Sequence, residues 1–131
     1  MNKHLLSLGL GLAMLAGAQS PDAANIQLLN IDVPGVGLND TTAAKPVGGN
    51  PGTTVGEQRR IAYQFAMDLW GGVLKSNVDI KIYASFAALT CDSTSAVLGQ
   101  AGANWIVYNS PGAIPNTIYP SALGDALAGE G

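Results

Sequence analysis

Residues 57–86, EQRRIAYQFAMDLWGGVLKSNVDIKIYASF, decide the fold. Apolar residues recur every three or four positions in the first part, and this period predicts an amphipathic helix over residues 55–75. Apolar and polar residues then alternate, which predicts a strand over residues 78–86 with one face exposed to water. Only Ser76 and Asn77 separate the two patterns, so we expect the helix and the strand to pack as a tight unit.

The start of the predicted helix carries a capping box. Thr54 is followed three residues later by Glu57, an arrangement in which each side chain accepts a hydrogen bond from the other residue's backbone N–H. The pair Arg59 and Arg60 follows in the first turns, and we expect it to lie on a solvated face.

Two apolar rows run along the helix. Their members are spaced four residues apart, and we expect both rows, including Trp70, to pack in the core: Ile61, Phe65, Leu69 and Val73 in one row, and Ala62, Ala66, Trp70 and Leu74 in the other. The pair Gly71-Gly72 weakens the last turns, by about 1 kcal/mol per glycine relative to alanine. The missing side chains also permit another backbone to approach closely.

The flanking sequence predicts a small α+β domain. We expect a first strand over residues 25–33 and a third over 104–109, which with 78–86 form a small mixed sheet beside one main helix. Residues 34–56 are rich in Gly, Pro, Asn and Thr and predict a long loop that fixes the entry to the helix. Residues 119–129 predict a short helix, with Pro120 in its first turn and Gly129 as its stop.

The first 18 residues are typical of a signal peptide. A basic start precedes an apolar run from Leu5 to Leu15, and Ala16-Gly17-Ala18 matches the pattern that signal peptidase reads. The apolar run is shorter than the roughly 20 residues that span a bilayer, so the alternative of an uncleaved anchor is disfavoured and no stable membrane insertion is expected. We therefore expect a secreted or periplasmic protein whose mature domain covers residues 19–131.

The charge of the mature domain disfavours a nucleic-acid partner. Removal of the signal peptide leaves five basic and nine acidic residues, a net charge of −4. The basic residues do not cluster as they do in proteins that neutralise a phosphate backbone.

The sequence supplies few residues for catalysis. The only histidine, His4, lies in the predicted signal peptide, which excludes His-based zinc sites and general bases from the mature domain. The single cysteine, Cys91, is compatible with a free thiol, an intermolecular disulfide, a small buried apolar residue, or a disulfide partner further along a longer polypeptide, which we favour. The motifs NDTT (39–42) and CDSTS (91–95) could offer oxygen ligands to a hard cation, but ordinary Asx turns are favoured.

Three stretches carry a resemblance to a known family: GLNDTTAAKPVGGNPGTTVGEQRR (37–60), ASFAALTCDSTSAVLGQAGA (84–103) and SPGAIPNTIYPSALGDALAG (110–129). Together they resemble secreted bacterial proteins that contain a protease-associated (PA) domain and look like zinc metallopeptidases of the metzincin-like kind. The likeness runs from about Ile26 to Gly129, and it implies that the chain corresponds to the N-terminal half of a metzincin-like catalytic domain.

The resemblance implies zinc in the full-length family, bound by an HExxH helix downstream of the matched region. This sequence has no HExxH motif and no PA domain, so no catalytic or metal-binding residue carries over to it. The resemblance also implies that Cys91 pairs with a later cysteine and that the partner of this chain is the C-terminal part of the same polypeptide. Two alternatives stay open: a small secreted binding or surface-interaction module without enzymatic activity, and an exported α+β protein of another role.

Overall fold

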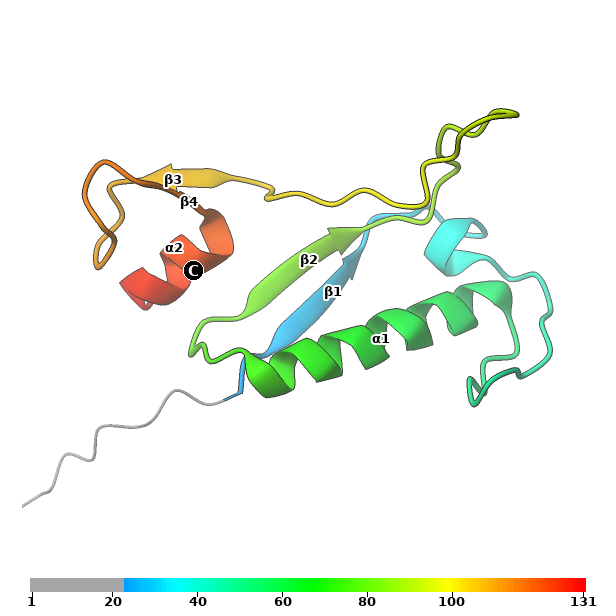
Figure 1. Cartoon of the computed structure of the whole chain (residues 1–131). Coiled ribbons are helices and arrows are strands. Elements are labelled where there is room, and N and C mark those ends of the chain that lie inside the picture. The colour runs from blue at the N-terminus through cyan, green and yellow to red at the C-terminus, as the bar shows by residue number, and fades with distance from the viewer. Residues whose placement is uncertain (1–22) are drawn as a thin grey trace, which may run out of the picture.

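The computed structural model describes residues 23–131 and contains two small units joined by a long connection (Figure 1). The first unit consists of strand β1 (Ile26–Asn30), the 3-10 turn η1 (Gly37–Asn39), helix α1 (Val55–Val73) and strand β2 (Ile80–Ala84). The second consists of strands β3 (Ile106–Tyr108) and β4 (Ile118–Pro120) and helix α2 (Ser121–Ala128). The predicted signal peptide, residues 1–18, lies outside the described residues.

The α+β class is confirmed, but the strands form two sheets. β1 and β2 pair in parallel, from Ile26 opposite Ile80 to Asn30 opposite Ala84. Helix α1 connects them and lies against one side of the pair (Figure 1). β3 and β4 pair antiparallel with α2 beside them. The expectation of one mixed sheet is wrong, because β3 pairs with β4. The sequence did not predict β4, because the prolines in and near it favour a loop.

Helix α1 packs through small residues against the segment just before β1 and against the end of η1. A Cβ atom at Gly71 would lie 2.8 Å from the carbonyl oxygen of Ala24, and one at Gly56 would lie 2.7 Å from the backbone nitrogen of Asp40. Met67 lies on the same face of the helix and is buried. The close approach predicted for the glycine pair is therefore confirmed at Gly71, whereas a Cβ at Gly72 would meet nothing within 4 Å.

The two apolar rows of α1 do not form the core as expected. Trp70 is 61% exposed, and Phe65, Leu69 and Val73 are 65%, 59% and 69% exposed. The prediction that Trp70 lies in the core is wrong, because the close contact at Gly71 turns the face that carries Gly56, Met67 and Gly71 toward β1. Most members of the two apolar rows are therefore exposed, and Ile61 is half-buried.

The remaining boundaries lie close to those predicted. α1 ends two residues before the predicted helix, and β2 is shorter than predicted. The alternation holds in part: Ala84 is buried and Ile80 half-buried, Lys81 and Tyr83 are exposed, but Ile82 is exposed as well. The short C-terminal helix is confirmed as α2. Pro120 precedes this helix as its N-cap, and Gly129 ends it with a left-handed φ of 76°.

Candidate functional site

The carboxyl ends of β1 and β2 meet beside the start of α1, and Asp32 joins the segments that converge there. Its Oδ2 atom accepts hydrogen bonds from the backbone N–H of Leu38, at 2.7 Å, and of Phe86, at 2.9 Å. Leu38 belongs to η1 and is fully buried. One carboxylate therefore ties η1 to the exit of β2.

Two arginines of α1 hold η1 from the other side. Arg59 Nη1 donates to the carbonyl oxygen of Gly37 at 2.7 Å, and Arg60 Nη1 donates to that of Leu38. The Arg59 guanidinium also lies over the ring of Phe86, 3.9 Å from its centroid, in cation–π geometry. The expectation of a solvated arginine pair is wrong, because η1 presents carbonyl oxygens to both guanidinium groups.

The charged groups of this junction are directed at the main chain and at one another. Hydrogen bonds from Thr42, and to a smaller extent the charge of Arg59 at 3.5 Å, hold the pKa of Asp40 below its ordinary value. Within residues 23–131, no buried side-chain nitrogen or oxygen lacks a hydrogen-bond partner. The junction formed by Asp32, Arg59 and Phe86, called here the Asp32 clasp, therefore joins η1, α1 and the end of β2 within the first unit.

The predicted capping box is confirmed. Thr54 Oγ1 accepts from the backbone N–H of Glu57 at 3.2 Å, and Glu57 Oε2 accepts from the backbone N–H of Thr54 at 3.0 Å. Thr53 donates two further bonds to the same carboxylate, one from its hydroxyl and one from its backbone. These Thr53 bonds are the main reason that the pKa of Glu57 lies below its ordinary value.

The long loop is fixed to the start of α1. Val47 and Asn50 pair across a two-residue turn in which Gly48 and Gly49 have φ values of 58° and 83°, as a tight hairpin turn requires. The Gln58 side chain donates to two loop carbonyl oxygens, at 2.8 and 3.0 Å. The loop thus fixes the entry to α1, as predicted.

Both Asp-Thr/Ser motifs form Asx turns, as favoured from the sequence. Asp40 Oδ1 accepts from the backbone N–H of Thr42 at 2.9 Å. Asp92 Oδ1 accepts from the backbone N–H groups of Thr94 and Ser95, at 2.7 and 2.8 Å. These bonds, with those of the Thr94 and Ser95 hydroxyls, lower the pKa of Asp92 to about 2.

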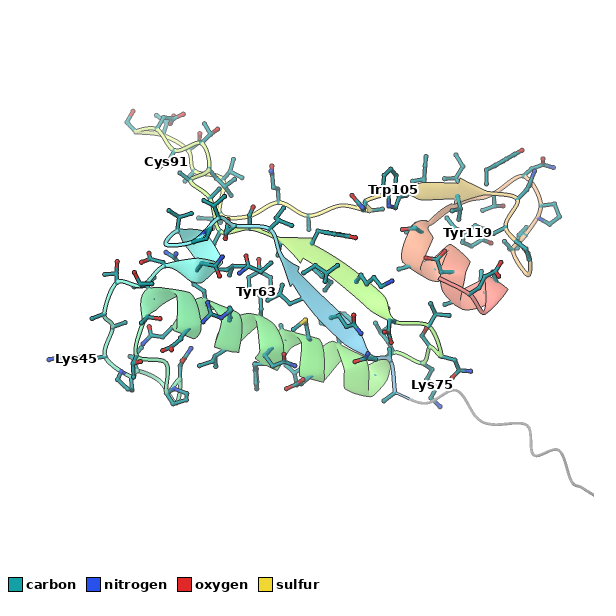
Figure 2. The ribbon with its side chains drawn as sticks, turned by 180° about the vertical axis from the view of Figure 1, so that it is seen from behind. Lys45, Tyr63, Lys75, Cys91, Trp105 and Tyr119 are labelled. Carbon is teal, nitrogen blue, oxygen red and sulfur yellow. The ribbon has the colours of Figure 1, made fainter. Side chains whose placement is uncertain are left out.

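Residues 85–97 project from the first unit as a hairpin arm. Cys91 pairs with Ala96 as an isolated antiparallel bridge, and the N–H of Val97 donates to the carbonyl oxygen of Thr90 at 2.9 Å. Cys91 is an exposed free thiol, and Figure 2 shows it on the arm, away from both units. The small buried apolar residue, one of the alternatives for Cys91, is therefore wrong.

Two segments, called here the legs of the arm, lead into and out of it. Below the arm the legs separate and enclose a groove along the outer edge of β2, called here the β2 groove. One leg is residues 79–89, which include β2, and the other is residues 97–105, which return to β3 (Figure 1). Three adjoining cavities lie between them, of about 250 Å³ near the arm, about 570 Å³ beside β2 and about 220 Å³ beside α2. The middle cavity, beside β2, is the largest of these three.

The residues singled out from the sequence do not gather in one site. Thr54 and Glu57 meet in the capping box, whereas Trp70 lies exposed near the other end of α1 and Cys91 lies on the arm. Sequence reasoning missed Asp32, although an aspartate at the end of a predicted strand and just before a Pro-Gly turn is a usable indication of a side chain that bonds to turn backbone.

Within residues 23–131, no group of three or more His, Cys, Asp or Glu side chains is placed to hold a metal ion. None of the described helices is long and apolar enough to span a membrane. No family model, curated protein or solved structure matches the chain. The likeness to PA-domain zinc metallopeptidases therefore rests on the quoted sequence motifs.

Proposed function

We propose that this chain is the N-terminal scaffold part of a secreted zinc metallopeptidase-like protein, and that it is not catalytic by itself. The sequence motifs at residues 37–60, 84–103 and 110–129 are the basis for proposing this family. The incomplete β1–β2 sheet is the main structural support for a scaffold role. In this proposal the chain shapes and stabilises one side of a larger domain.

The open β1–β2 sheet is the observation that carries the proposal. Parallel sheets occur almost only where both faces are covered, and two isolated strands are marginally stable in water. Here only α1 covers the pair, and β1 and β2 have no further strand beside them among the described residues. A sheet in this state has the features of part of a larger sheet.

The distribution of apolar side chains agrees with an incomplete domain. Among the described residues, the buried apolar residues are Ala24, Leu38, Met67 and Ala84, a very small core for a domain of this length. Large apolar side chains on α1 and in the second unit are exposed instead, Trp70 and Trp105 among them. Contiguous exposed apolar surface commonly marks an interface.

The zinc that the resemblance implies has no ligands in the described part of the chain. A zinc site in a peptidase takes three protein ligands, mostly histidine, and residues 23–131 contain no histidine. We therefore place zinc binding and peptide cleavage in another part of the polypeptide. In the proposal, Cys91 joins the scaffold to that part by a disulfide, for which its exposure on the arm leaves room.

The test compares two proteins expressed with export to the periplasm. One is the 131-residue chain, and the other is the natural reading frame that contains it. We expect the longer protein to bind one zinc ion, to cleave an unfolded protein substrate and to lose activity with a chelator. We expect the 131-residue chain to bind no zinc ion and to cleave no substrate. Zinc-dependent cleavage by the 131-residue chain would refute the assignment of a scaffold role, and a longer protein without zinc would refute the family.

A second candidate function is a small secreted binding module without enzymatic activity. The exposed outer face of α1, with Phe65, Leu69 and Val73, favours it, because such a face on a secreted protein fits a partner surface. The two candidates differ in the source of that partner. A Phe65→Ser, Leu69→Ser double substitution should impair secretion and folding of the longer protein if this face is covered within one polypeptide, and should leave folding unchanged if it binds a separate partner.

A further inference from the structure

The proposed function needs a further strand beside the β1–β2 sheet, and the free edge of β1 offers a place for it, which leaves the β2 groove for a separate ligand. We propose that the β2 groove accepts one extended segment of another polypeptide, which pairs with β2 as an additional strand. The inference rests on the unpaired edge of β2, on the separation of the two legs of the arm, and on the side chains that line the groove.

The outer edge of β2 presents unpaired backbone groups. On the side toward β1, the N–H of Ile80 donates to Asn25 at 2.9 Å and the carbonyl oxygen of Ala84 accepts from Ile31 at 3.0 Å. Because backbone groups alternate in direction along a strand, those of Lys81 and Tyr83 point away from β1 and into the groove. Neither residue forms a strand pair on that side with any described residue. Exposed edges of this kind bind extended peptides through backbone hydrogen bonds.

The second leg runs beside this edge without pairing with it. The legs are bonded to each other near the tip of the arm, where Val97 donates to Thr90 and Asp92 donates to Ser95. Beyond that point, the cavity of about 570 Å³ separates residues 81–85 from residues 100–104. Cβ atoms at Gly99 and Gly102 would meet nothing within 4 Å, so this leg has room on its own surface. The legs thus have the arrangement of two antiparallel strands with the middle strand absent.

The walls of the groove decide the kind of occupant. The groove has β2 on one side and residues 97–105 with the start of α2 on the other. A single extended segment brings two free edges and fits between two walls. The edge strand of a second copy of this chain brings its own neighbouring strand or helix with it, which the second wall blocks. An extended segment without a sheet of its own is therefore favoured over a second copy.

The side chains along the groove favour an alternating segment. Lys81 forms no ion pair among the described residues and lies on the face of the sheet opposite α1, next to Tyr83. Ile82 and Tyr63 line the same cavity and offer apolar contact. A segment with apolar side chains toward Ile82 and an acidic side chain toward Lys81 matches both faces.

The experiment uses the peptide acetyl-TVEVTV-amide and the isotope-labelled 131-residue chain, followed by NMR. We expect saturable shifts with a Kd below about 1 mM, and slower amide hydrogen exchange at Lys81 and Tyr83 when the peptide is bound. The control peptide carries N-methyl groups on alternate residues, which remove the donors on one edge. We expect it to bind at least about tenfold more weakly, a loss that corresponds to roughly one hydrogen bond.

Two substitutions at one position separate backbone pairing from side-chain packing. Tyr83→Pro removes the outward N–H without removing a bond to β1, whereas Tyr83→Ala keeps that N–H and removes the ring. We expect Tyr83→Ala to retain binding and Tyr83→Pro to lose it, with the amide spectrum of β1 unchanged in both. Equal binding of both peptides would overturn the proposal, as would no binding tighter than about 1 mM. Slow exchange at Lys81 and Tyr83 without peptide would also overturn it, because closure of the two legs or pairing with a second copy would then fill the groove.

Discussion

The two adjacent glycines of α1 should respond to alanine in opposite directions. Both lie inside the helix, where alanine is favoured over glycine by about 1 kcal/mol. At Gly72 a Cβ atom meets nothing within 4 Å, so Gly72→Ala keeps this gain. At Gly71 the Cβ atom would lie 2.8 Å from the carbonyl oxygen of Ala24, a backbone atom that itself belongs to the contact between α1 and the start of β1.

The magnitude follows from these two terms. Overpacking against a fixed neighbour costs about 1–3 kcal/mol, because the helix or the neighbouring backbone has to move. For Gly71→Ala this cost offsets the gain in helix propensity or exceeds it. We therefore expect the free energy of unfolding of Gly72→Ala to exceed that of Gly71→Ala by about 2 kcal/mol. For a chain of this size, this difference separates their Tm values by on the order of 10 °C.

Urea and thermal unfolding of both variants, followed by far-UV circular dichroism, provide the assay. The wild-type chain should lie between the two variants or close to Gly71→Ala. The double variant reports whether the two effects add, as they should if a side chain at position 72 contacts no other element. Equal stabilisation by both substitutions would refute the reasoning, because it would mean that α1 does not contact Ala24 at Gly71.

The capping box, the Asp32 clasp and the arm each make a further prediction. Thr54→Ala should lower the free energy of unfolding by about 1 kcal/mol, whereas Thr54→Ser, which keeps the hydroxyl, should keep most of it. Urea unfolding measures both, and equal stability of the two variants would contradict the role of the cap. Asp32→Ala should cost about 2 kcal/mol, because the N–H groups of Leu38 and Phe86 lose their acceptor, whereas Asp32→Asn, which keeps an acceptor oxygen, should cost less. Asp92 has a pKa of about 2 in the folded arm, below its ordinary value of 3.8. Its carboxylate therefore stabilises the arm at any pH above 3.8, and this stabilisation is lost as the pH falls from about 4 to about 2. NMR titration of the arm should show the midpoint near pH 2, and a midpoint near pH 4 would mean that the Asx turn does not form in solution.

The local elements were predictable because short-range physics determines them. The capping box needs only the spacing between Thr54 and Glu57, and the alternation of β2 needs only the pattern of apolar residues. The stop of α2 at Gly129 follows from the preference of glycine for a left-handed conformation. Each of these features depends on residues within one turn or one strand.

The orientation of α1 was not predictable from its apolar pattern. Two sides of the helix carry apolar or small residues, and the pattern favoured the side with Phe65, Leu69 and Trp70. The structure instead places Gly71 against Ala24, where the absence of a side chain allows the backbones to approach. Glycine has no side chain, so a contact between backbones at a glycine does not contribute to the periodic pattern of apolar residues. The sequence pattern therefore did not indicate it.

The Asp32 clasp was missed for a related reason. Asp32, Leu38, Arg59 and Phe86 are separated by up to 54 residues, and they meet only because β1 pairs with β2 and α1 packs against η1. The sequence presents Arg59 and Arg60 as an ordinary charged pair at a helix start. Their role depends on the carbonyl oxygens of η1, whose position is set by the tertiary fold.

If this chain forms the scaffold part of a longer secreted protein, the mass of the natural polypeptide will show it. An antibody against the exposed loop at residues 45–50 would isolate that polypeptide from culture medium or periplasm for intact-mass and disulfide analysis. We expect a mass well above that of residues 19–131, a zinc-binding HExxH sequence in the added part, and Cys91 in a disulfide with a cysteine of that part. A polypeptide that ends at Gly131 with Cys91 as a free thiol would rule out the scaffold role.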